Sequence, residues 1–145
     1  MINNSAELSL SALLIGEYET DRSLVRDIFR KLRWHLFEAR DRRGAIQCLK
    51  RNPVHVVLTE TEGPDWNWKQ MLRALRGVRP QPQLIVTSRL ADNHLWAEVL
   101  NVGAYDVLLQ PFEREEVERV VASARRHFNF EPERAGQVTV HAGVA

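Results

Sequence analysis

The fold can be predicted from residues 84–112, which read LIVTSRLADNHLWAEVLNVGAYDVLLQPF. Two short apolar runs, Leu84–Thr87 and Tyr105–Leu109, predict strands. The stretch between them begins with Asp92 and Asn93, either of which can start a helix, and closes at Gly103. Its apolar residues at helical spacing are expected to form a buried face: Leu95, Trp96, Val99 and Leu100. Two short strands joined by a helix predict a parallel pair.

The same alternation of short apolar runs and amphipathic stretches occurs five times along the chain. The other predicted strands are Leu10–Ile15, Trp34–Ala39 and Val54–Thr59. The other predicted helices run from Asp21 with Thr20 as cap, from the cap Asp41 to Asn52, from Trp66 to Gly77, and over residues 111–128. Five buried strands separated by helices, with no hairpin signal, call for a parallel sheet covered on both faces. We therefore expect a doubly wound, five-stranded α/β fold.

The length of 145 residues suits a single domain. We assign residues 9–128 to that domain, 1–8 to an N-terminal extension and 129–145 to a C-terminal tail. The amphipathic pattern fades after residue 128, where we expect a loose tail in preference to an edge strand built from QVTVHAGV.

The charge is unevenly placed, although the net charge is only +1. Between Arg22 and Arg51 there are ten Lys or Arg and three acidic residues. A solvated basic helix face is the favoured explanation, and an anionic partner is the alternative. We do not expect a nucleic-acid partner, because no helix-turn-helix or other recognised binding element accompanies these residues.

Several other features of the sequence favour structural roles. The one cysteine, Cys48, is expected to pack in a helix, with a reactive thiol as the alternative. Three tryptophans, Trp66, Trp68 and Trp96, are expected in the core, with a partner surface as the alternative. No export signal and no apolar run of membrane-spanning length are found in the sequence, so we expect a cytoplasmic protein without membrane contact.

In a doubly wound sheet, ligands bind at the carboxyl ends of the strands. These ends carry Gly16-Glu17, Glu60, Ser88 and Gln110. The surrounding segments are ALLIGEYETDR, VVLTETEGP, LIVTSR and VGAYDVLLQPF, and Gly103 stands fifteen residues after Ser88. In this order and spacing they resemble the response regulator receiver family, the CheY-like domains, over about residues 9–128.

The resemblance implies a phosphorylation pocket in which several positions differ from the family pattern. The family has two acidic residues after the first strand, where this chain has Gly16 and Glu17. Glu60 stands at the position of the phosphate-accepting Asp, Ser88 matches the family's Thr or Ser, and Gln110 replaces the Lys of a Lys-Pro pair. Only Glu17 and Glu60 remain to hold a metal ion, so we expect magnesium to bind weakly if at all, and no other cofactor.

These differences weaken the chemistry of phosphoryl transfer. Gln110 can donate a hydrogen bond but lacks the positive charge that neutralises the transferred oxygens. Glu60 is one methylene longer than Asp, and a misplacement of about an ångström can cost roughly 100-fold in rate. We therefore expect no useful phosphorylation. Two alternatives stay open: Glu60 imitates a phosphorylated Asp, or Glu17 and Glu60 are solvated carboxylates and Ser88 caps the turn that follows it.

The resemblance implies a signalling module of a two-component system or phosphorelay, not an enzyme. We expect a pseudo-receiver that binds a sensor kinase, an output protein or a second copy of itself through its fourth helix, fifth strand and fifth helix. One alternative is a phosphorylatable receiver with an unusual acceptor site. Another is a flavodoxin-like binder of a small ligand, which is disfavoured because GEYETDR, residues 16–22, would repel an anion and is not rich in glycine.

Overall fold

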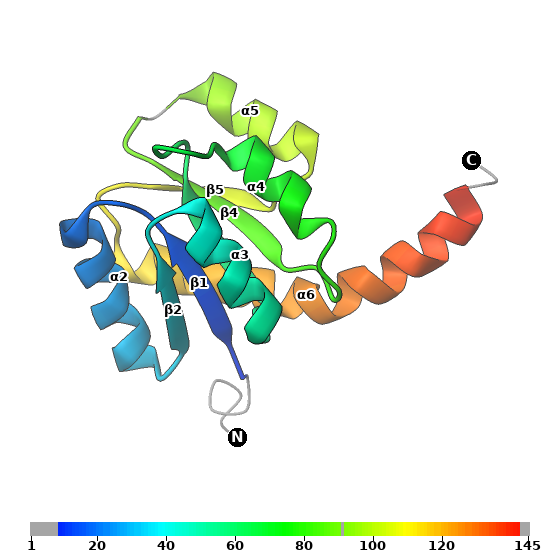
Figure 1. The fold of residues 1–145 in the computed structure, drawn as a ribbon, viewed down its shortest axis with the longest axis horizontal. Coiled ribbons are helices and arrows are strands. Elements are labelled where there is room, and N and C mark those ends of the chain that lie inside the picture. The colour runs from blue at the N-terminus through cyan, green and yellow to red at the C-terminus, as the bar shows by residue number, and fades with distance from the viewer. Residues whose placement is uncertain (1–8, 91, 143–145) are drawn as a thin grey trace.

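The computed structural model describes residues 9–90 and 92–142, and for residues 129–142 it describes the backbone only. A parallel sheet with the strand order β2-β1-β3-β4-β5 lies at its centre (Figure 1). The strands are β1 (Ser11–Ile15), β2 (His35–Ala39), β3 (Val56–Glu60), β4 (Gln83–Ser88) and β5 (Asp106–Leu109). Each overlaps its predicted apolar run, and all four pairings are parallel. The predicted five-stranded α/β fold is therefore confirmed.

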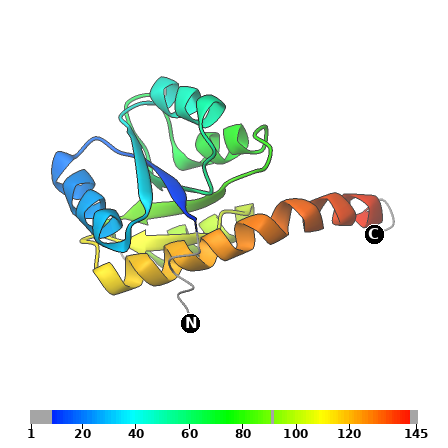
Figure 2. The same ribbon diagram turned by 90° about the horizontal axis from the view of Figure 1, so that it is seen from below.

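Helices cover both faces of the sheet. One face packs against α2 (Glu19–Leu32) and α6 (Arg114–Ala142), and the other packs against α3 (Arg42–Arg51), α4 (Trp68–Leu75) and α5 (Asn93–Val102). Figure 2 shows α3 and α4 on one side of the sheet and α6 on the other. Within β1, Leu14 belongs to the first core and Leu13 to the second, as the two-residue period of a strand requires.

Two of the predicted helix starts are confirmed by side-chain caps. Asp41 accepts a hydrogen bond from the backbone N–H of Gly44 at 2.8 Å, and Asp92 accepts one from His94 N–H at 2.9 Å. Gly103 ends α5 with φ of 113°, a left-handed conformation that glycine adopts without steric cost.

The predicted cap of α2 was wrong. The helix begins at Glu19, and Tyr18 occupies the cap position without a side-chain hydrogen bond. The N–H of Arg22 donates to the Tyr18 carbonyl at 3.1 Å, so Thr20 already lies inside the first turn. Glu19 and Asp21 place negative charge in that turn, which the helix dipole favours.

Helix α4 begins at Trp68, two residues after the predicted start, because Asn67 and Gln70 form a capping box with two hydrogen bonds of 2.9 Å. Trp66 lies in the loop before this cap and is buried, and its indole Nε1 donates to Thr59 Oγ1 at 3.1 Å. A β-carbon on Gly63 would stand 2.1 Å from the Trp66 ring, so the loop needs glycine there.

The predicted buried face of α5 was half wrong. Val99 is buried and Leu95 is half-buried, but Trp96 is 51% exposed and Leu100 is 48% exposed. The reason is the position of α5 at one edge of the sheet, where β5 is the last strand and covers only a narrow stripe of the helix.

The expectation of a loose tail or an edge strand after residue 128 was also wrong. The backbone of α6 continues as a helix to Ala142 and extends past the sheet (Figures 1 and 2). The continuing segment contains good helix formers such as Glu133, Arg134, Ala135 and Gln137, and its helix includes Pro132, whose ring removes one backbone hydrogen bond. No helix in the described part of the chain is both long enough and apolar enough to span a membrane.

Candidate functional site

A cleft of about 280 Å³ lies at the carboxyl ends of the strands. It brings together three of the predicted site residues, Glu60, Ser88 and Gln110. The fourth, Glu17, lies beside the cleft with an exposed side chain. The other lining residues are Tyr18, Thr61, Glu62, Thr87, Arg89 and Leu90. Parallel strands bring these positions to one edge of the sheet although they are far apart in the sequence.

The side chain of Glu60 occupies the space above Gly16. A β-carbon on Gly16 would stand 3.0 Å from Glu60 Oε2 and 3.3 Å from its carboxyl carbon. The Glu60 carboxylate thus lies so close to position 16 that it would have to shift by a few tenths of an ångström to admit a side chain there. The two departures from the family pattern are sterically complementary, because the longer acid takes the space left by the missing one.

The Glu60 carboxyl lies in an environment that disfavours its charged form. Burial raises its pKa above the ordinary value for glutamate, and the backbone N–H of Glu17 acts in the opposite direction. The carboxylates of Asp21 and Glu17 raise the pKa further, and Arg89 lowers it. The centre of the cleft is therefore an acid with two other acids and one arginine near it.

The residues of the cleft do not fit the magnesium ion that the family resemblance implies. Gly16 offers no ligand, and the oxygens of Glu60 fill the space beside it. Magnesium requires strict octahedral geometry around oxygen ligands. Within the described ranges, no three His, Cys, Asp or Glu side chains are grouped so that they could hold a metal ion. Glu17 and Glu60 are the carboxylates left for an ion, and waters would have to fill the other positions.

Ser88 and Gln110 form hydrogen bonds with residues close to them at the strand ends. Ser88 Oγ accepts a hydrogen bond from Leu90 N–H at 3.1 Å and lies 3.3 Å from the Leu90 carbonyl, to which it donates. It thus caps the turn after β4, the structural role considered as an alternative for it. The Gln110 side chain is buried, and its backbone N–H donates to the Ser88 carbonyl at 2.8 Å. Among the described residues, no hydrogen bond joins Glu60 to either side chain.

An ion pair at the mouth of the cleft was missed by the sequence analysis. Arg89, in the loop after β4, lies 2.6 Å from Asp21 in the first turn of α2, and its guanidinium is 5.7 Å from the centre of the Tyr18 ring. Arg89 is the cation that influences Glu60 in place of the family's lysine. Its position directly after Ser88, at a strand end, was the available signal.

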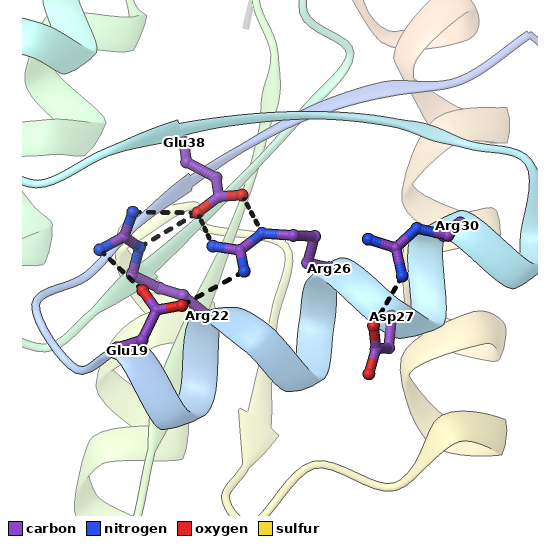
Figure 3. A network of polar contacts seen from close by, with 6 residues as sticks. All are labelled: Glu19, Arg22, Arg26, Asp27, Arg30 and Glu38. Atoms are coloured by element: carbon purple, nitrogen blue, oxygen red, sulfur yellow. Dashed lines mark hydrogen bonds and ion pairs between the residues drawn. The ribbon is translucent and has the colours of Figure 1, made fainter.

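A second polar network neutralises part of the basic segment (Figure 3). Arg22 and Arg26 of α2 both bind Glu38 of β2, with distances of 3.0 Å from Arg22 Nη2 and 2.7 Å from Arg26 Nε. Glu19 lies 3.5 Å from Arg22 Nη1, a long ion pair that makes no hydrogen bond, and 3.2 Å from Arg26. The hydrogen bond from Arg26 holds the pKa of Glu38 below its usual range in spite of burial, and Arg22 adds to this.

The tryptophans, Cys48 and His55 lie outside the cleft, and most of them are explained by packing or by a local hydrogen bond. Trp66 and Trp68 are core residues, whereas Trp96 is exposed, so the core expectation was right for the first two and wrong for the third. Burial raises the pKa of the Cys48 thiol, in keeping with a packing role. His55 Nδ1 accepts a hydrogen bond from Ser11 N–H at 2.9 Å.

A groove of about 190 Å³ runs between α5, β5 and the start of α6. Its apolar lining residues are Leu90, Trp96, Val107 and Leu109, and Asp92, Asn93 and Glu116 supply the polar ones. We call this the apolar groove. The indole Nε1 of Trp96 donates to Asp106 Oδ1 at 3.3 Å, which holds the ring against β5. Leu90 lines both this groove and the cleft around Glu60.

Comparison with known proteins gives a consistent result. The family model of the response regulator receiver domain matches residues 12–122. The chain is 24% identical over 124 residues to the response regulator protein PilR of Pseudomonas aeruginosa and 26% identical over 122 residues to the transcriptional regulatory protein CrdR of Helicobacter pylori. These matches cover 86% and 83% of the chain but only 28% and 55% of the two relatives.

Solved structures support the same fold. The signal receiver domain of an HD domain-containing protein from Pseudomonas fluorescens superposes with a TM-score of 0.77 at 24% identity. The superposition covers 88% of this chain and 94% of that domain.

Proposed function

This chain belongs to the response regulator receiver family of two-component systems, and we propose that within it the chain acts as a pseudo-receiver that binds a protein partner without taking up a phosphoryl group. Receiver domains are in general signalling modules and not enzymes. We extend this to the present chain and assign no catalytic residue.

The observation that carries this proposal is the packing of Glu60 over Gly16. A phosphoacceptor needs its oxygen placed for in-line attack, beside a metal ion that neutralises charge. Here the carboxylate at the acceptor position occupies the volume of the missing acid, 3.0 Å from where a β-carbon at position 16 would stand. The carboxylate at the acceptor position therefore crowds the place where the family has a metal ligand.

The distribution of charge supports the same conclusion. Gln110, at the position of the family's lysine, is buried and uncharged. The cation that approaches the cleft, Arg89, is already held by Asp21 at 2.6 Å. A phosphoryl group would have to enter among Glu17, Asp21 and Glu60 without a free positive charge to stabilise it.

The apolar groove is the surface we propose for the protein partner. Receiver domains interact with kinases and output domains, and some of them dimerise. In this chain Trp96, Leu100 and Leu109 are each about half exposed near one edge of the sheet, at 51%, 48% and 46%. Exposed aromatic and aliphatic side chains gathered beside a groove are typical of protein interfaces. The partner we expect is a sensor kinase, an output protein or a second copy of the chain.

The test is incubation of the purified protein with acetyl phosphate and magnesium, followed by intact-mass spectrometry. We expect no stable, magnesium-dependent mass increment on the native chain. The triple variant Gly16→Asp/Glu60→Asp/Gln110→Lys rebuilds the family pattern and serves as the positive control. An increment on the native chain that disappears in Glu60→Gln would show a working switch with an unusual acceptor and would refute the proposal.

A further inference from the structure

The solvent-exposed positions of α3 and α4 are occupied only by basic and amide side chains. In α3 the amide is Gln47, and in α4 it is Gln70. One exposed basic residue, Lys69 of α4, is paired with Glu98 of α5. The others form a surface that we call the basic face: Arg42, Arg43, Lys50 and Arg51 of α3, Arg73 of α4 and Arg76 at its end. No acidic residue and no large apolar residue is exposed on either helix.

The basic face is not neutralised within the molecule. Among the ion pairs formed by residues 9–128, none involves a side chain of the basic face. The arginines of α2 differ, because Arg22, Arg26 and Arg30 are paired with Glu38, Glu19 and Asp27 (Figure 3). The basic residues between Arg22 and Arg51 therefore divide between the two faces of the sheet. On α2 three of the four cations are paired, whereas within the described residues none of the four on α3 is.

Helices α3 and α4 form one continuous surface. They lie side by side on the same face of the sheet in both views (Figures 1 and 2), and both pack into the same core. Their C-terminal ends meet at a cavity lined by Leu49 and Asn52 on one side and by Val78 and Arg79 on the other. Arg73 of α4, far from α3 in the sequence, thus enlarges the basic face. Arg76 lies at its border, because its guanidinium donates to the Val102 carbonyl at the end of α5 at 3.1 Å.

Helix stability does not account for all of these cations. Lys50, Arg51 and Arg73 lie in last turns, where positive charge suits the helix dipole. Arg42 and Arg43 lie in the first turn of α3, which contains no acidic residue and where the dipole disfavours positive charge. The helix dipole therefore does not explain these two arginines.

We propose that the basic face binds the phosphate backbone of double-stranded nucleic acid without sequence preference. A protein interface needs an apolar centre, which this surface lacks and the apolar groove has. Interfaces with nucleic acid are polar and strongly positive, and the arginine fork matches a phosphate group. The sequence contains no nucleic-acid recognition motif, but a motif is required for reading bases and not for holding phosphates.

The test is fluorescence anisotropy of a labelled DNA duplex over a range of salt concentrations. We expect a dissociation constant of roughly 10⁻⁶ to 10⁻⁴ M near physiological salt, weakening steeply as salt increases. In Arg43→Gln/Lys50→Gln, the slope of log K against log salt should fall by about 2, because two phosphate contacts are lost. The matched control, Arg30→Gln/Lys31→Gln on α2, removes the same charge from the opposite face and should bind as the native chain does.

Charge-conserving exchange supplies a second variant. Arg43→Lys/Lys50→Arg should keep the salt slope of the native chain, and circular dichroism should show the native helix content in every variant. Equal weakening in the control, or no binding at low salt, would overturn the proposal. Binding of poly-glutamate but not of the duplex would overturn it too, since the face would then be a site for an acidic protein.

Discussion

The contact between Gly16 and Glu60 can be tested by restoring the missing acid. In Gly16→Asp the new β-carbon would lie 3.0 Å from Glu60 Oε2, and a second carboxylate would follow it into the same space. We expect the free energy of unfolding to fall by about 1–3 kcal/mol, the usual cost of overpacking. Chemical denaturation with urea measures it.

The control is the double variant Gly16→Asp/Glu60→Asp. Shortening Glu60 removes the collision, so the two changes should be strongly coupled, and the double variant should be more stable than Gly16→Asp alone. Additive effects would show that the two side chains do not share one volume.

His55 makes stability depend on pH. Burial, and then the charge of Arg125, lower the pKa of His55 from 6.5 to about 4. Because this folded-state pKa lies below the unfolded value, the stabilisation is complete above about pH 6.5 and is lost as the pH falls through 4. Since the side chain is only partly buried, we expect a loss on the order of 1–2 kcal/mol.

Urea denaturation at pH 7 and pH 4.5 tests this, with His55→Asn as the reference. Asparagine can still accept the hydrogen bond from Ser11 N–H but does not titrate, so the difference in unfolding free energy between the variant and the native chain should change with pH in favour of the variant. A constant difference would exclude His55 as the titrating group.

At the scale of elements, Glu38 ties α2 to the edge strand β2. Its side chain is 20% exposed, and that of Arg22 is 10% exposed. Glu38→Gln would leave the nearly buried Arg22 with the exposed Glu19, 3.5 Å away, as its remaining acidic partner, so we expect a loss of about 2 kcal/mol in unfolding free energy. Glu19, whose side chain is 62% exposed in the same network, is the matched control, and Glu19→Gln should cost less than about 1 kcal/mol. Equal losses would mean that burial does not decide the strength of these pairs.

The helix starts show which local sequence signals are sufficient to predict where a helix begins. The caps Asp41 and Asp92 were predicted because an acidic residue directly precedes each helical pattern. The start of α4 was misplaced because the apolar Trp66 extends the periodic pattern past the true cap, Asn67. Only the folded loop, with Trp66 bonded to Thr59, shows that this tryptophan belongs to the core beneath the helix and not to the helix itself.

In the molecule as a whole, two tryptophans differ in role: Trp66 lies in the core and Trp96 on the proposed binding surface. Trp66 is 3% exposed and Trp96 is 51% exposed. We expect Trp66→Ala to lower the unfolding free energy by about 3–5 kcal/mol, as for other buried aromatic residues. Trp96→Ala should cost less than about 1 kcal/mol, because its role lies at a surface. Thermal and urea unfolding followed by circular dichroism compares them, and a large loss for Trp96→Ala would place it in the core after all.

The two proposed binding surfaces, the apolar groove and the basic face, lie in different parts of the molecule. The apolar groove lies at the β5 edge of the sheet, and the basic face lies on α3 and α4. A protein partner in the groove and a nucleic acid on the basic face would therefore use different side chains. Trp96→Ala should leave the salt dependence of duplex binding unchanged.

The alternation of strands and helices, the parallel sheet, and the strand ends that carry Glu60, Ser88 and Gln110 could be predicted from the amino-acid sequence. Those features are local, since they follow from apolar periodicity and from the residues that begin and end each element. The folded structure was needed to show that the Glu60 carboxylate lies against Gly16, that Arg89 pairs with Asp21 across 68 positions, and that Trp96 stays exposed. Each of these depends on which elements become neighbours in space and on how much of a helix the edge of a sheet can cover, and no local pattern records that.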